Sequence, residues 1–208
     1  FVILDDVQFP RRGYVHRNNF LKHSGDSGWL TLPIKKCPQD TLIKDLSFHQ
    51  NADELFLTQL QKFPALKEGS VAFMPLAPAF QNFQGSVVEK VISTIERVRS
   101  VLEIKCNVLR SSALESTCLN GQEKIISLVN LVGGTHYVNS PGGVNLYDPE
   151  IFERNNLKLS FLEPYQGSSL SIAQEIISGR NVTEVRQDIS SQLNLTNGRE
   201  LRARPTEY

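Results

Sequence analysis

The chain has 208 residues, with 22 Lys and Arg against 22 Asp and Glu, so its formal net charge is zero. A balanced charge gives no bulk attraction to a polyanion, which argues against a dedicated nucleic-acid-binding module. The sequence has no apolar run of the ~18–20 residues that span a bilayer, and no signal-peptide pattern at its start. Its three cysteines form no C-x-x-C pair. We therefore expect a protein of the reducing cytoplasm.

The first half of the chain predicts two strands and two helices. An apolar strand is expected at residues 1–4, then a polar loop at 5–28 and a second strand at 29–34. Asn51, followed by two acids, predicts the start of a helix that runs to residue 63, because a side-chain oxygen and negative charge both suit a helix N-terminus. Residues 86–103 repeat apolar side chains at intervals of three and four, which indicates an amphipathic helix.

The second half alternates short strands with helices. Strands are expected at 107–109, 136–138 and 157–162, and helices at 121–132, 148–155 and 171–178. This alternation predicts an α/β fold with a mostly parallel, open sheet and helices on both of its faces. We expect residues 1–178 to form a single α/β domain. Beyond Gly179 the apolar pattern thins, so 179–208 is expected to be a C-terminal extension that is partly mobile.

Two acids, Asp5 and Asp6, directly follow the first apolar run. The carboxyl ends of strands line the ligand crevice of open α/β sheets, so these carboxylates are candidate catalytic groups. They could act as a general base, accept hydrogen bonds from sugar hydroxyls, or bind a metal ion. The alternative is that they only cap the segment that follows.

The loop after these acids is rich in basic and amide side chains. Guanidinium groups bind phosphate or carboxylate through paired hydrogen bonds, so the loop is a candidate anion clamp. Its candidate substrate- or phosphate-binding residues are Gln8, Arg11, Arg12, Arg17 and Asn18. His16 is a candidate catalytic group because an imidazole titrates near neutral pH. The alternative is an ordinary solvated basic loop.

A second candidate anion site follows the strand expected at 136–138. Ser140, Gly142 and Gly143 lie where glycines let a ligand approach the backbone N–H groups, although a plain strand-to-helix turn explains them equally well. Arg110 also follows a strand and could reach the same crevice. No spacing of His, Cys, Asp and Glu indicates a metal site, and no G-x-S-x-G elbow is present.

Taken in order, these motifs resemble the WbqC-like protein family over roughly residues 1–178. The most specific block combines the opening strand and acids with Arg17-Asn18 and the run 29–33. A second block covers 135–143 with Tyr147, Asp148 and Phe152 behind it, and a third covers 170–172.

The resemblance implies a bacterial transferase of surface-polysaccharide (O-antigen) biosynthesis. It would move an acyl or aminoacyl group, such as glycine, from an activated donor to a nucleotide-linked or lipid-linked sugar. Asp5, Asp6 or His16 would be its general base, and Arg11, Arg12 and Arg17 would hold a phosphate. Two alternatives stay open: a nucleotide-binding enzyme of the adenylyl- or nucleotidyl-transfer type, and a non-catalytic partner in a polysaccharide assembly complex. The sequence indicates neither a cofactor nor an oligomeric state.

Three features depart from the family pattern. An upstream segment of the type Q-P-x-Y-x-P-x-x-G-Y-F is absent, so the N-terminal strand and loop of the family are expected to be missing, together with one wall of the pocket. Asn19 stands where a basic residue is frequent. The run 140–143 replaces the commoner S-G-P-A type of sequence.

Overall fold

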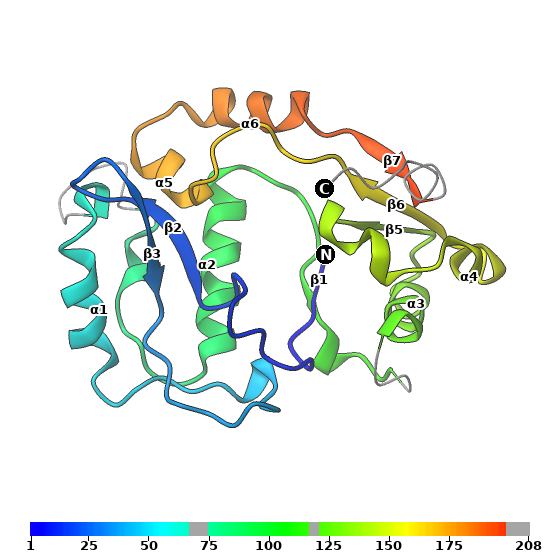
Figure 1. The fold of residues 1–208 in the computed structure, drawn as a ribbon, viewed down its shortest axis with the longest axis horizontal. Coiled ribbons are helices and arrows are strands. Elements are labelled where there is room, and N and C mark those ends of the chain that lie inside the picture. Colours follow the sequence, from blue (N-terminus) through cyan, green and yellow to red (C-terminus); the bar gives the residue numbers. More distant parts are fainter. Residues whose placement is uncertain (67–74, 117–120, 199–208) are drawn as a thin grey trace. The chain divides into compact units, whose positions relative to one another are not determined.

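The computed structural model describes residues 1–66, 75–116 and 121–198 (Figure 1). By their internal contacts these residues separate into two compact units, which we describe one at a time. The first unit comprises residues 1–109 and 168–187, and the second comprises 110–167 together with the chain from residue 188 onward. Within the described ranges, none of the helices is both long and apolar enough to cross a membrane.

An antiparallel hairpin is the central element of the first unit. It consists of β2 (Arg17–Leu21) and β3 (Ser27–Thr31), with Arg17 opposite Thr31 and Asn19 opposite Trp29. The connecting turn is closed by the Lys22 N–H, which donates to the Asp26 carbonyl at 2.9 Å. Gly25 has a φ of +86° in this turn, a conformation that glycine adopts at little cost.

The other elements of the first unit are helices and one short strand pair. Strand β1 (Val2–Ile3) pairs with β4 (Leu109–Arg110). The α-helices are α1 (Ala52–Leu60), α2 (Val87–Val101), α5 (Ile172–Ile177) and the first part of α6 (Val182–Ser191). Short 3₁₀ turns are η1 (Ile43–Asp45), η2 (Pro64–Leu66) and η3 (Ala77–Phe80). Helix α2 begins where the Ser86 hydroxyl accepts the Glu89 N–H, a standard N-cap.

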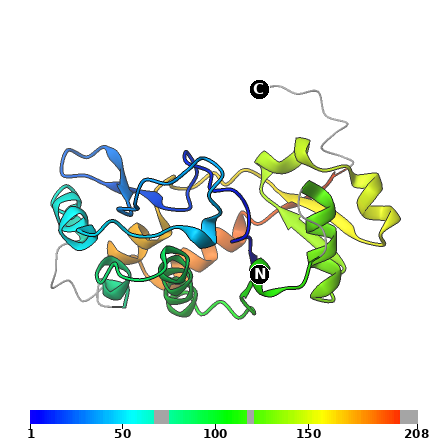
Figure 2. The same ribbon diagram turned by 90° about the horizontal axis from the view of Figure 1, so that it is seen from below.

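The hairpin has one packed face and one open face. Phe20 and Leu30 point to the packed face and are buried. The Phe20 ring meets Phe63 and Phe80 edge to face, with both centroids 6.1 Å away. In the view of Figure 2, α1, α2 and α5 all lie to the same side of the hairpin. Because side chains alternate along a strand, Trp29, which is next to Leu30, points to the open face.

Backbone groups on both edges of the hairpin form hydrogen bonds with glutamine side chains of neighbouring helices. On β3, the Gln59 amide of α1 accepts the Thr31 N–H at 3.2 Å and donates to the Thr31 carbonyl at 3.0 Å. On β2, the Gln174 amide oxygen of α5 accepts the Leu21 N–H at 3.2 Å, and the Ser171 N–H donates to the Asn19 carbonyl at 2.8 Å. An edge strand with unpaired backbone groups is unstable, so these contacts fix the position of the hairpin.

The second unit is built on a three-stranded sheet in the order β5 (His136–Asn139), β6 (Lys158–Leu162) and β7 (Leu195–Asn197). β5 and β6 are parallel, whereas β6 and β7 are antiparallel. The remaining elements are η4 (Ser111–Ala113), α3 (Gly121–Leu131), η5 (Pro141–Leu146) and α4 (Pro149–Arg154). One face of the sheet is covered by an aromatic cluster of Tyr137, Tyr147, Phe152 and Phe161.

The structure confirms a mixed α/β fold and each helix expected from periodicity. It does not confirm a mostly parallel open sheet, because the strands of the described residues form three small sheets. The β5–β6 pair, which has α4 as its crossover, has a parallel register. The tight turn at residues 22–26 cannot make a parallel connection, so β2 and β3 are antiparallel.

Two regions hold more regular structure than the sequence pattern indicated. Strand β2 lies inside the loop expected at 5–28, and α6 and β7 lie inside the expected C-terminal extension. The division at residue 178 into a domain and an extension stays a prediction. Residues 199–208 of that extension lie outside the described residues.

Candidate functional site

The loop that carries most of the candidate residues is held by a second segment of the first unit. The Lys44 N–H donates to the Asp5 carbonyl at 2.7 Å, and the Ile43 N–H donates to the Val7 carbonyl at 3.0 Å. Phe9 packs into a buried cluster with Ile43, Leu46, Val87 and Val88. The segment from Asp5 to Phe9 is therefore anchored to the core of the first unit rather than free in solvent.

The two acids differ in their access to solvent. Asp5 is fully buried, with 0% of its surface exposed, whereas Asp6 is half-buried. Both carboxyl residues are engaged with other groups of the fold. Nearby, the exposed Gln8 amide donates to the Gln39 carbonyl at 2.8 Å. Asp6 is therefore the one of the two acids that a ligand reaches more directly.

Of the neighbouring arginines, Arg11 is bound to the fold and Arg12 is not. The Nη2 of Arg11 donates hydrogen bonds to the carbonyls of Cys37 and Pro38, both at 2.7 Å. These bonds tie the loop to the chain near residue 37. Arg12 is exposed, and its guanidinium makes no hydrogen bond or ion pair with any part of the chain that the structure describes. Arg12 is thus the arginine with all its donors available to an anion.

Arg17 joins the loop to two exposed aromatic rings. Its Nε donates to the Gly13 carbonyl at 3.2 Å, and its Nη2 donates to the Arg12 carbonyl at 2.7 Å. The guanidinium lies over the Trp29 ring, 4.2 Å from the centroid. The Tyr14 ring lies 5.3 Å from the Trp29 ring and is tilted by 60°. We call Tyr14, Arg17 and Trp29 the Trp29 platform.

Sequence reasoning did not assign a role to Tyr14 or Trp29. The mostly apolar run 29–34 predicts a strand but does not show which of its faces is buried. In the structure, Trp29 is 41% exposed and Tyr14 is 68% exposed, whereas Leu30 is buried. The available signal was strand alternation, which puts Trp29 and Leu30 on opposite faces whichever of them is buried.

His16 lies between the platform and the core of the first unit. Its carbonyl accepts the Leu32 N–H at 2.7 Å, and its ring meets Phe9 edge to face with centroids 4.9 Å apart. Burial lowers the pKa of His16, and the charge of Arg17 lowers it further. The ring is therefore neutral at neutral pH and can accept a proton.

The two ring nitrogens of His16 are in different surroundings. Nδ1 is buried and has no hydrogen-bond partner, and it is the only such side-chain atom found among the described residues. A buried nitrogen without a partner makes a charged ring costly, which explains why the neutral form is favoured. His16 as a residue is half-buried, so Nε2 is the candidate nitrogen for a substrate proton. Asn18, two residues further on, uses its side-chain oxygen to accept the Asn19 N–H at 2.8 Å.

The other candidates belong to the second unit. The Ser140 N–H donates to the Asn139 side-chain oxygen at 2.7 Å, and the Gly143 N–H donates to the Ser140 carbonyl at 3.1 Å. A Cβ at Gly143 would lie 2.4 Å from the Asn139 side-chain nitrogen, so close packing explains this glycine. Gly142 is exposed, and Arg110 is half-buried and engaged. Anion binding at this loop stays a prediction.

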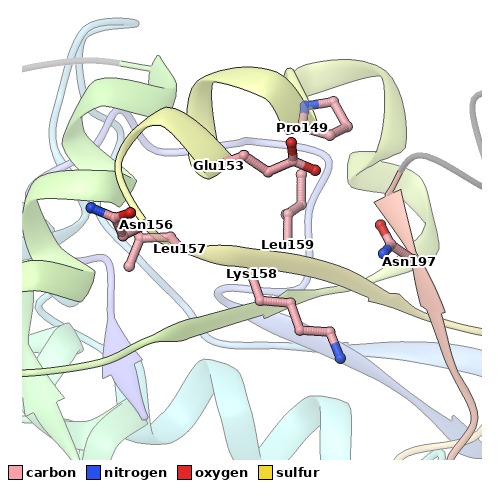
Figure 3. Close-up of a pocket in the computed structure, with 7 residues that line it drawn as sticks. All are labelled: Pro149, Glu153, Asn156, Leu157, Lys158, Leu159 and Asn197. Atoms are coloured by element: carbon pink, nitrogen blue, oxygen red, sulfur yellow. The ribbon is translucent and has the colours of Figure 1, made fainter.

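The second unit also contains a hollow of about 290 Å³ beside α4 (Figure 3). Its lining includes Pro149 and Glu153 of α4, Lys158 and Leu159 of β6, and Asn197 of β7. Figure 3 shows Leu159 pointing toward α4 and Lys158 pointing away from it. None of the site residues predicted from the sequence lines this hollow. In the described parts of the chain, no three His, Cys, Asp or Glu side chains gather as metal ligands would.

Comparison with protein families places most of the chain in one of them. The model of the WbqC-like protein family matches residues 1–169. The matched range includes every residue of the candidate site. No curated protein matches the chain, and no solved structure matches it.

Proposed function

Because the chain belongs to the WbqC-like protein family, whose model matches 169 of its 208 residues, we propose that it is a cytoplasmic transferase of bacterial surface-polysaccharide biosynthesis. It moves an acyl or aminoacyl group, such as a glycyl group, onto the sugar of an O-antigen precursor. The neutral imidazole of His16, in the loop that also carries the exposed side chains of Arg12 and Tyr14, is the observation that carries this proposal.

The proposed step is an acyl transfer with His16 as general base. An amino or hydroxyl group of the sugar attacks the carbonyl carbon of the activated acyl donor. The new C–N or C–O bond forms as the bond to the leaving group breaks, and the leaving group keeps that electron pair. The proton of the attacking group passes to His16 Nε2. A base of this kind works best when it is unprotonated at the working pH, as the lowered pKa of His16 provides.

Other residues of the loop have supporting roles in this proposal. Arg12 has its donors available for a phosphate of the donor or acceptor. Arg11 and Arg17 keep the loop in shape through their bonds to backbone carbonyls. Asp6 is the alternative base, because it is partly exposed whereas Asp5 is buried.

The test is a transfer assay read by mass spectrometry. The purified chain is mixed with nucleotide-linked amino sugars and with activated donors of three classes: aminoacyl-tRNA, acyl thioesters and aminoacyl adenylates. We expect one sugar to gain the mass of the acyl group. His16→Gln should lower the rate by about 100-fold or more, as loss of a general base does. His23→Gln, at an exposed position near the hairpin turn, is the matched control and should keep the rate.

Two results would contradict the proposal. One is that no donor class modifies any sugar while a nucleoside triphosphate is converted with release of pyrophosphate. This would favour the adenylyl- or nucleotidyl-transfer alternative. The other is that neither reaction occurs and a polysaccharide assembly complex retains the chain, which would favour a non-catalytic partner.

A further inference from the structure

The Trp29 platform exposes more aromatic surface than the fold requires. Trp29 is the only tryptophan of the chain, and 41% of its surface is in solvent, together with 68% of that of Tyr14. The buried face of the same hairpin is filled by Phe20 and Leu30, so Trp29 has no role in that core. Exposed aromatic side chains with polar edges are typical of binding surfaces.

Arg17 and Trp29 of the platform are held in place before any ligand arrives. Arg17 is fixed by two backbone carbonyls, at 3.2 and 2.7 Å, and covers one face of the Trp29 ring at 4.2 Å. Gln59 and Gln174 fix the two edges of the hairpin that carries both residues. A surface with its rotamers already fixed loses less entropy when it binds a ligand.

The angle between the Tyr14 and Trp29 rings indicates which shape of ligand can pack against them. Tyr14 and Trp29 touch at a centroid distance of 5.3 Å and an angle of 60°, so no parallel slot separates them for a flat base to enter. They form an open corner instead. A puckered pyranose ring fits such a corner, because the C–H groups on one of its faces pack on an aromatic ring while its hydroxyl groups stay at the rim in water.

An exposed cation of the same loop indicates the charge of the ligand. The carbonyl of Arg12 accepts a hydrogen bond from Arg17, so Arg12 borders the platform. Its guanidinium is exposed and makes no bond or ion pair with the described residues. A guanidinium with its fork of donors available binds a phosphate through paired hydrogen bonds.

We infer that the Trp29 platform binds the pyranose ring of a sugar phosphate, with the phosphate at Arg12. This inference rests on the proposed function in one respect: it identifies the sugar as the acceptor of the acyl group. It assigns the sugar to Tyr14 and Trp29, and the adjoining phosphate to Arg12. The ligand class is therefore a glycosyl phosphate, either free or as part of a nucleotide-linked or lipid-linked sugar.

The single tryptophan makes a direct test possible, because all tryptophan fluorescence of the chain comes from Trp29. The chain is titrated, without any acyl donor, with hexose 1-phosphates, the matching free hexoses, inorganic phosphate and a nucleoside monophosphate. We expect a saturable change in Trp29 emission with a hexose 1-phosphate and a weaker one with the free hexose. Inorganic phosphate and the nucleoside monophosphate should leave the emission unchanged.

Two variants and two controls locate the binding site. Tyr14→Ala should weaken binding of the sugar phosphate by about tenfold, which corresponds to the loss of one aromatic contact. Arg12→Gln should lower the affinity for the sugar phosphate to that for the free sugar. Leu57→Ala on α1 and Lys36→Gln remove an exposed apolar group and an exposed cation of the first unit, and should change neither titration.

The outcomes separate this inference from the proposed function. The inference is overturned if no sugar changes the Trp29 emission. It is also overturned if the nucleoside monophosphate changes the emission as strongly as the sugar phosphate does. Acyl transfer that proceeds at the full rate in Tyr14→Ala also overturns it, although the transferase itself then stands. Saturable binding of the sugar phosphate that Tyr14→Ala weakens, in a chain that transfers no acyl group, supports the platform and contradicts the proposed transfer.

Discussion

His16 links the candidate chemistry to the stability of the fold. Its pKa is lowered in the folded chain from the usual 6.5, first by burial and then by Arg17. As the pH falls below about 6.5, the unfolded chain therefore binds a proton before the folded chain does. The free energy of unfolding therefore decreases as the pH falls from the usual pKa of histidine to the lowered pKa of His16 in the folded chain. At pH values above the usual pKa of histidine, the contribution of neutral His16 to stability is fully present.

We predict that in His16→Phe the free energy of unfolding decreases less steeply as the pH is lowered. The substituted ring cannot take up a proton, and it keeps an aromatic contact with Phe9. The measurement is urea unfolding of both chains at several values between about pH 5 and 8, the range in which a histidine changes its charge. An unchanged slope in the variant would show that His16 is not held neutral by the fold.

His136 of the second unit gives an independent comparison. Its pKa is also lowered, by burial and then by Lys158, and its Nε2 lies 2.9 Å from the Ser160 hydroxyl. A double variant, His16→Phe with His136→Gln, should therefore depend on pH less steeply than either single variant. The two residues lie in different units, so we expect each substitution to flatten the pH dependence of unfolding in its own unit.

Arg11 and Arg12 are adjacent and equally charged, yet we predict opposite outcomes for them. Arg11→Ala should lower the free energy of unfolding by about 1 kcal/mol, since it removes the bonds to Cys37 and Pro38. Arg12→Ala should leave stability within about 0.5 kcal/mol of the parent chain, because Arg12 makes no such bond to the described residues. Chemical denaturation of the two variants checks this, and equal losses would contradict the assignment of roles.

At the scale of elements, the hairpin depends on two glutamine side chains from distant parts of the sequence. Gln174 is buried, accepts the Leu21 N–H and donates to the Ser178 hydroxyl at 2.8 Å. We predict that Gln174→Ala destabilises the chain by about 1 kcal/mol, because it removes the hydrogen bond of a part-buried edge N–H. The Leu21 amide should then exchange its hydrogen faster, while amides of the sheet in the second unit keep their rates. Unchanged exchange at Leu21 would show that α5 does not hold this edge.

Sequence periodicity predicted the helices well and the strands less well. The apolar residues that repeat every three or four positions up to Leu102 are sufficient to predict α2, because a helix that packs on one face requires this pattern. Strand β2 was not predicted because its residues Arg17, Asn18 and Asn19 are polar. They form a strand because side chains from α1 and α5 complete the two edges of the hairpin, and contacts that distant leave no local pattern.

The candidate site was predicted in part for the same reason. Sequence alone singled out the loop and His16, since an ionisable group within a polar run is visible without a structure. It could not separate Arg12 from Arg11 and Arg17, because the carbonyls that bind the latter two are set by the fold of the loop. It also left Trp29 unassigned, since an apolar run does not show which of its faces is open.

At the scale of the whole molecule, the first unit is completed by a segment that returns late in the chain. The family match ends at residue 169, whereas residues 168–187 rejoin the first unit. This segment supplies Gln174 and the Ser171 N–H to the outer edge of β2. The hairpin that carries the Trp29 platform therefore depends on residues that lie mostly beyond the matched range.

Two compact units in one chain predict two unfolding transitions, and the single tryptophan distinguishes them. Trp29 lies in the first unit, so its fluorescence follows that unit alone, whereas far-UV circular dichroism follows both. Phe152 is fully buried in the second unit, and Phe56 is buried in the first. Truncating either ring to alanine should cost about 3–5 kcal/mol in its own unit.

We therefore expect Phe152→Ala to move part of the dichroism transition to lower urea while the Trp29 transition stays in place. Phe56→Ala should move the Trp29 transition instead. The reason is that a cavity destabilises the cooperative unit that contains it, and it leaves another unit unchanged if few interactions connect the two. Coincident fluorescence and dichroism transitions in both variants would mean that the chain unfolds as one cooperative body. The platform of the first unit would then depend on the packing of the second.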